Sequence, residues 1–107
     1  SYLVSFAPDR ADLTGRAREV VAEAARNARR AQTTRIQMVG HAGGSGWPLH
    51  NERLSQRRAE TVASELAARG VPRQEIGVAS SGEGRPPAPA TDGARKPQNL
   101  RVEIALR

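Results

Sequence analysis

Apolar and polar positions along the chain predict four β-strands. Residues 2–6 alternate and form a short strand that Pro8-Asp9 ends, and residues 35–40 and 76–80 are two more short runs of strand character. In residues 100–106, apolar side chains take every second position and alternate with charged or small ones. Because successive side chains of a strand point to opposite faces, this last segment is predicted to have one buried face.

Two segments between these strands have the spacing of amphipathic helices. Residues 16–31 place apolar side chains at i, i+3, i+4 and i+7, after Thr14, a residue type that caps helix N-termini. The second helix is predicted from Pro48 to Ala68, because proline suits a first helical position and Gly70 suits a C-terminal cap. The predicted core stripes contain Ala17, Val20, Val21, Ala24, Ala28 and Ala31 in the first helix, and Ala59, Val62, Ala63 and Leu66 in the second.

The order of these elements is strand-helix-strand-helix-strand-strand, which predicts an α+β fold. With 107 residues, the chain is predicted to form one domain, 1–107, with a core between a sheet and a helical layer. Aliphatic side chains and alanine must fill that core, since the chain has one Trp, one Tyr and one Phe. Residues 82–98, rich in Gly and Pro, are predicted to form a long loop.

The chain carries a formal net charge of +6, and 16 of its 17 basic residues are arginine. Such a charge favours acidic partners, but the arginines are spread over both helices and the tail, so most are expected to be solvated. Because no aromatic stacking platform accompanies them, a nucleic-acid partner is not expected. The absence of cysteine excludes disulfides and zinc sites of the cysteine type.

No apolar run approaches the roughly 20 residues of a membrane-spanning helix, so the domain itself is not expected to cross a membrane. Ser1 is followed at once by a predicted strand. We therefore expect the domain to belong to a longer protein, whose membrane anchor would lie in a segment outside residues 1–107.

Candidate chemistry is concentrated between the second predicted strand and the second helix. Gly43, Gly44 and Gly46 leave main-chain N–H groups unshielded just before the helix, so they could bind an anion. Glycines are equally expected there if the chain only needs a tight turn. His41 and His50 flank the loop without a third ligand-type residue nearby in sequence, so no metal or other cofactor is expected. No nucleophile has a histidine and a carboxylate in a suitable arrangement, so the domain is not expected to be an enzyme.

Asn51, Leu54 and Arg58 share one side of the second helix, within a sector of roughly 60°. Arg58 is predicted on the flank between core and solvent, while Arg57 points away from the core. From that flank the guanidinium could offer two parallel N–H groups to a carboxylate. Alternatively, its stem packs on the sheet and its charged end meets water.

Several residues occur at spacings that resemble a known family. They are Gly40-His41, then Asn51, Leu54-Ser55, Arg58-Ala59 and Asn99-Leu100-Arg101-Val102-Glu103. The OmpA-like C-terminal domain family, which is peptidoglycan-associated, has Gly-His-Thr-Asp, a gap of seven residues, Asn, two more residues, Leu-Ser, two more, Arg-Ala, and later Asn-Arg-Arg-Val. The gaps here match without an insertion, and the resemblance covers essentially the whole chain.

The resemblance implies a βαβαββ two-layer sandwich, in which a mixed four-stranded sheet carries two helices on one face. The last strand would lie between the first and second strands and run antiparallel to both. Family members bind peptidoglycan non-covalently by holding the diaminopimelate of the stem peptide. In them the loop aspartate meets the amino group of that residue and the helix arginine meets its carboxylate, which is the role implied for Arg58. The full set of ligand-binding residues that the resemblance implies is Ala42, Gly43, Asn51, Leu54, Arg58 and Arg101.

The chain departs from the family pattern in the loop itself. Ala42-Gly43 stands where the family has Thr-Asp, so the carboxylate for the ligand ammonium is missing. Losing one partner of a desolvated charge contact costs about 2–5 kcal/mol, or about 30-fold to several thousand-fold in affinity. Glu52 and Glu83 are the acidic residues nearest in sequence.

Two functions are therefore expected of such a chain. The first is a peptidoglycan-binding anchor domain of a bacterial envelope protein, located in the periplasm and attached to the outer or inner membrane, with a weakened diaminopimelate pocket. The second is an OmpA-like scaffold that has lost cell-wall binding and mediates contacts with other envelope proteins.

Overall fold

The computed structural model describes residues 1–31, 35–41, 48–81 and 101–106. The loop predicted over residues 82–98 and the glycines of residues 42–47 lie outside this description. The elements, in chain order, are β1 (Tyr2–Ser5), α1 (Gly15–Arg30), β2 (Ile36–His41), α2 (Pro48–Ala68), the short 3-10 helix η1 (Arg73–Glu75), β3 (Ile76–Ser81) and β4 (Arg101–Leu106). The predicted order is confirmed, and the strand boundaries differ from the predicted ones by one residue or none.

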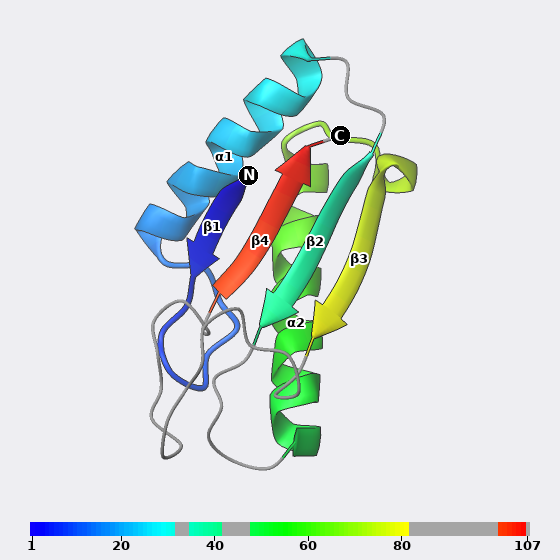
Figure 1. Cartoon of the computed structure of the whole chain (residues 1–107). Helices are drawn as coiled ribbons and strands as arrows, with labels where there is room; N and C mark the ends of the chain where they lie inside the picture. Colours follow the sequence, from blue (N-terminus) through cyan, green and yellow to red (C-terminus); the bar gives the residue numbers. More distant parts are fainter. Residues whose placement is uncertain (32–34, 42–47, 82–100, 107) are drawn as a thin grey trace.

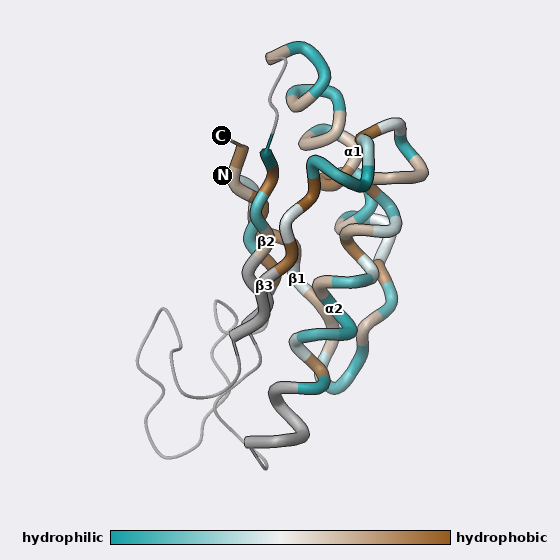
Figure 2. Tube along the Cα trace, turned by 90° about the vertical axis from the view of Figure 1, so that its right-hand side faces the viewer, coloured by the Kyte–Doolittle hydropathy of each residue, from teal (hydrophilic) through white to brown (hydrophobic). Residues whose placement is uncertain are grey.

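The four strands form one sheet in the order β1-β4-β2-β3. Strand β4 runs antiparallel to both β1 and β2, whereas β2 and β3 run parallel. Both helices cover the same face of the sheet, which Figure 1 shows from the open face and Figure 2 shows edge-on as two layers. The expected two-layer α+β architecture with a mixed four-stranded sheet is therefore confirmed.

Strand β4 lies between β1 and β2, and one of its faces is buried, as its alternating sequence predicts. Val102 and Ile104 are fully buried under the helices and lie opposite Val4 and Tyr2 of β1. On the other side, Ile104 lies opposite Met38, another fully buried residue. Aliphatic side chains of three adjacent strands thus form one continuous apolar surface, which is what a helical layer needs in order to pack.

The phase of α2 agrees with its predicted stripe, whereas the stripe of α1 is shifted. Ala59, Val62, Ala63 and Leu66 of α2 are all fully buried. In α1 the buried residues are Ala17, Val21, Ala24, Ala25 and Ala28. The prediction for Ala31 was wrong, since Ala31 is exposed, whereas Val20 is half-buried and packs against the core. Ala31 is exposed because it is the C-cap, one residue beyond the helix.

The predicted caps are both present. The Thr14 hydroxyl accepts a hydrogen bond from the main-chain N–H of Ala17 at 3.0 Å and so caps α1. Gly70 has a φ of 99°, in the left-handed region. Around it the N–H of Gly70 donates to the carbonyl of Ala67 and the N–H of Val71 to that of Leu66, both at 3.1 Å. This double hydrogen bond is a Schellman motif, which requires the positive φ that glycine supplies.

Candidate functional site

One predicted site position, Arg101, lies at the end of the sheet where β1, β2 and β3 end. Ser5, the last residue of β1, and His41, the last residue of β2, both lie opposite Arg101, the first residue of β4. His41 also lies opposite Ser81, the last residue of β3. The chain leaves β1 at this end of the sheet toward the loop before α1 (Figure 1).

Of the six predicted ligand-binding residues, the structure describes the side chains of two, Leu54 and Arg58. Ala42 and Gly43 lie outside the described residues, as do the side chains of Asn51 and Arg101. Leu54 is buried, with 3% of its surface exposed, and Arg58 is fully buried at 0%.

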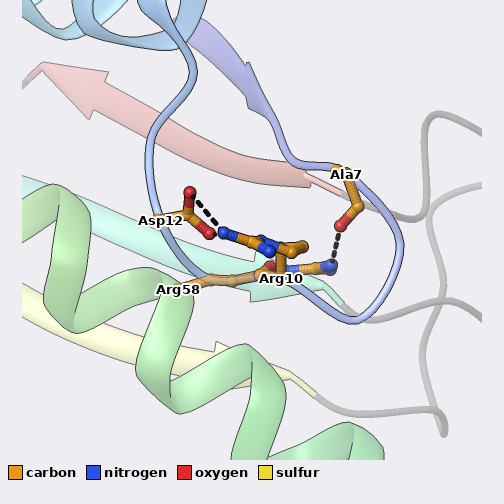
Figure 3. A network of polar contacts seen from close by, with 4 residues as sticks. All are labelled: Ala7, Arg10, Asp12 and Arg58. Atoms are coloured by element: carbon orange, nitrogen blue, oxygen red, sulfur yellow. Dashed lines mark hydrogen bonds and ion pairs between the residues drawn. The ribbon is translucent and has the colours of Figure 1, made fainter.

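The burial of Arg58 corrects the expectation that its head would lie between core and solvent. Its Nε donates a hydrogen bond to the main-chain carbonyl of Arg10 at 2.7 Å, and its Nη2 donates to that of Ala7 at 3.0 Å. The ring of Phe6 lies over the guanidinium, with 5.1 Å between its centroid and Cζ. Figure 3 shows the side chain reaching from α2 to the loop that follows β1. The prediction used only the angular position of Arg58 on the helix. It was wrong because the loop after β1 folds over Arg58 and supplies the acceptors of these hydrogen bonds.

A tight turn gives the loop the shape that holds Arg58. The N–H of Arg10 donates to the carbonyl of Ala7 at 3.1 Å, which closes a four-residue turn with Pro8 and Asp9 at its centre. Asp9 has a φ of 58°. Proline followed by a residue with positive φ is typical of a type II turn, and Asp is among the non-glycine residues that tolerate this region. The Ala7 carbonyl thus accepts two hydrogen bonds, one from within the turn and one from Arg58.

The neighbours of Arg58 on α2 differ sharply in exposure. Ser55, one turn earlier, is fully buried, while Arg57 is exposed and points away from the core as predicted. Ser55 and Leu54 therefore belong to the packed side of the helix. The arginine that was predicted to serve as a ligand fork is thus part of the interior, and the adjacent arginine belongs to the surface.

An exposed ion pair lies on the same loop. The Nε of Arg10 is 2.7 Å from a carboxylate oxygen of Asp12, and both side chains are about two-thirds exposed, at 64% and 63%. The hydrogen bond from Arg10 lowers the pKa of the Asp12 carboxyl below its ordinary value of 3.8, and the Asp12 carboxylate raises the pKa of Arg10. Beside this pair a surface groove runs along α2, lined by Ala11, Asp12, Arg53, Gln56, Arg57, Glu60 and Thr61.

Sequence reasoning missed the contribution of Phe6, Ala7 and Arg10. The Pro-Asp pair was interpreted only as the end of the first strand. Two of the contacts to Arg58 are made by main-chain carbonyls, which every residue possesses, so residue type carries little signal for them. The one available signal was Pro8-Asp9 as a turn dipeptide between a strand and a helix.

Two further observations concern only the part of the chain that the structure describes. Within it, no group of three or more His, Cys, Asp or Glu side chains could hold a metal ion. None of its helices combines the length and the apolar character that crossing a membrane requires.

Comparison with known proteins shows the family of this chain. The model of the OmpA family matches residues 5–100. The chain belongs to the OmpA family. It is 47% identical over 113 residues to an outer membrane protein of Gluconacetobacter diazotrophicus, covering 99% of this chain and 30% of that protein. It is 43% identical over 70 residues to a peptidoglycan-associated lipoprotein of Legionella pneumophila, covering 65% of this chain and 40% of that protein.

Solved structures of the family share the fold. The peptidoglycan-associated lipoprotein from Burkholderia pseudomallei has a TM-score of 0.88 at 25% sequence identity, covering 100% of this chain and 91% of that chain. The OmpA-like domain of FopA1 from Francisella tularensis has a TM-score of 0.82 at 23% identity, over 98% of this chain and 72% of that one, and shows the fold alone. The OmpA-like domain resemblance is thereby confirmed. The chain spans 30% of the outer membrane protein and 40% of the Legionella lipoprotein, and is thus similar to one part of those longer proteins.

Proposed function

We propose that this domain binds peptidoglycan without catalysing a reaction and so anchors a bacterial envelope protein to the cell wall. Its ligand would be the diaminopimelate of the stem peptide, held at the sheet edge where β1, β2 and β3 end. Family membership supports the proposal, as do relatives that are named for their association with peptidoglycan. The observation that carries it is the match of the OmpA family model to residues 5–100, a range that includes Arg58.

The proposed contacts follow from charge. The Arg58 guanidinium would meet the ligand carboxylate, since an arginine fixed in a low-dielectric site makes short, strong contacts with carboxylates. Gly43 offers no side chain where the family has aspartate, so the ligand ammonium lacks that partner. We therefore propose an affinity about 30-fold to several thousand-fold below that of a site with the aspartate. Ala42, Asn51, Leu54 and Arg101 complete the proposed site.

The cellular location is part of the proposal. The relatives named above are outer membrane and peptidoglycan-associated proteins, and the chain covers only part of their length. We propose that the domain lies in the periplasm and is attached to the outer or inner membrane through another part of a longer protein.

One observation favours a second function, in which the domain is a scaffold for contacts with other envelope proteins. Arg58 is fully buried and bonded to the β1–α1 loop, so it has a structural role that would retain it without any ligand. Together with Gly43 in place of aspartate, this fits a domain that has kept the fold and lost cell-wall binding.

Sedimentation with purified peptidoglycan sacculi separates the two functions. We expect weak pelleting of the natural domain and stronger pelleting of Gly43→Asp, which restores the missing carboxylate. Gly44→Asp is the matched control, because it adds the same charge one residue further along and is expected to pellet like the natural domain. If the natural domain and Gly43→Asp both stay in the supernatant, peptidoglycan binding is refuted and the scaffold function is favoured.

A further inference from the structure

The orientation of Arg58 is set by a segment far from it in sequence. The acceptors of its two hydrogen bonds, in Arg10 and Ala7, lie 48 and 51 residues away. An arginine side chain normally loses much rotamer freedom when it binds a ligand. Here that freedom is lost when the domain folds, since two hydrogen bonds and burial fix the side chain. The guanidinium is therefore already ordered when a ligand arrives.

The two hydrogen bonds also engage one edge of the guanidinium. Nε and Nη2 form one of the edges through which arginine can grip a carboxylate with two parallel N–H groups. Both of these atoms donate to the turn, so that edge is occupied by protein. The Phe6 ring covers one flat face of the group. One edge and one flat face of the Arg58 guanidinium are therefore held by the segment from Phe6 to Arg10.

We infer that the turn Ala7–Arg10, together with Phe6, is the positioning element of the carboxylate site and fixes the orientation of the Arg58 side chain. This inference rests on the proposed function, in which Arg58 meets the ligand carboxylate. It adds a positioning residue, Asp9, whose backbone conformation controls affinity through the two carbonyls that flank it in the turn. According to this inference, ligand binding requires a correctly folded β1–α1 loop in addition to the motif residues on α2.

Asp9 is the position at which this can be tested, because its φ of 58° is unfavourable for most side chains. Asp9→Val places a β-branched residue there, so the turn is expected to open and displace the carbonyls of Ala7 and Arg10. Asp9→Asn and Asp9→Gly remove the charge but tolerate the same φ. These two variants separate the other contacts of the Asp9 side chain from the effect of backbone conformation.

The experiment is an NMR titration of the domain with meso-diaminopimelate, with the Nε–H signal of Arg58 as the reporter. In the natural domain this buried, hydrogen-bonded proton is expected to give a resolved, slowly exchanging signal. We expect Asp9→Val to lose that signal and to bind diaminopimelate at least about tenfold more weakly, which corresponds to about 1.4 kcal/mol. Asp9→Asn and Asp9→Gly are expected to retain both the Arg58 signal and the affinity of the natural domain. Spectra of core methyl groups establish that each variant is folded.

The possible failures are distinguishable. If neither the natural domain nor Gly43→Asp binds diaminopimelate, the proposed function fails and the inference falls with it. If the natural domain binds and a folded Asp9→Val binds equally well, only the positioning role is overturned. If Asp9→Val does not fold, Phe6→Leu replaces it, since leucine fills the space without a ring face. A folded Phe6→Leu with unchanged affinity and an unchanged Arg58 signal would then overturn the inference.

Discussion

Replacing Arg58 with alanine is expected to destabilise the domain, because it removes a buried side chain and both of its hydrogen bonds to the loop. A hydrogen bond from a charged donor contributes about 1.5–3 kcal/mol, and a desolvated cation–π contact contributes up to about 2 kcal/mol. The cost of burying the guanidinium, several kcal/mol, is recovered at the same time. The Ala7 carbonyl keeps its bond from the N–H of Arg10, whereas the Arg10 carbonyl loses the Arg58 donor.

Arg58→Ala is therefore expected to lower the free energy of unfolding by about 2–4 kcal/mol. This is the range for substitutions that create a cavity and remove a buried hydrogen-bond donor. For a domain of about 100 residues, each kcal/mol shifts Tm by about 4–8 °C. We expect a fall of roughly 8–32 °C in Tm, measured by far-UV circular dichroism during thermal unfolding.

Arg57→Ala is the matched control for this measurement. It removes the same charge from the next residue of α2, but the Arg57 side chain is exposed, so its free energy of unfolding is expected to change by less than about 0.5 kcal/mol. Equal Tm values for Arg57→Ala and Arg58→Ala would refute the burial of Arg58 and its hold on the loop. The prediction also has a practical consequence: loss of ligand binding in Arg58→Ala is interpretable only if the variant is shown to be folded.

Three further substitutions test other parts of the structure. Val62→Asp is expected to unfold the domain, because it places an unpaired charge at a fully buried position; an unchanged Tm would refute the helix phase. Gly70→Ala is expected to lower the free energy of unfolding, measured with urea, by about 1–2 kcal/mol. The cost comes from the φ of 99° alone, because the nearest atom to an added Cβ is 3.9 Å away on Arg29. An unchanged free energy of unfolding would contradict the Schellman motif. The Asp12 carboxyl is expected to titrate below its ordinary pKa of 3.8 in an NMR pH series and to return toward it in Arg10→Ala. Because the pKa of Asp12 is lower in the folded state, the pair favours folding above the unfolded pKa, and this contribution is lost as pH falls through the folded pKa. An identical Asp12 titration in both proteins would refute the ion pair.

The topology could be predicted from sequence because local signals agreed with one another. Alternation in the last strand, the Thr14 cap and the Gly70 cap each depend on the residues of one element, and all three were confirmed. The resemblance to the OmpA-like family added the central position of β4, which no local signal contains. The stripe of α2 was predictable because its apolar side chains are large enough to mark one face of the helix.

The environment of Arg58 could not be predicted from the sequence in the same way. Helix geometry places residue 58 at the edge of the apolar stripe, and whether such an edge is buried depends on what packs beside it. Here the deciding element is the loop after β1, and its contacts are carbonyls whose presence does not depend on side-chain type. In α1 the apolar residues are mostly alanine, so Ala25 was missed: small side chains mark the buried face only weakly.

Peptidoglycan binding through an arginine-carboxylate contact, weakened by Gly43, is the central claim. The most direct test is the affinity of the natural domain for a soluble stem-peptide fragment that contains diaminopimelate, measured by isothermal titration calorimetry beside Gly43→Asp and Gly44→Asp. We predict weak binding by the natural domain and by Gly44→Asp, and binding at least about 30-fold tighter by Gly43→Asp. Equal affinities for all three proteins, or no heat of binding from any of them, would contradict the claim.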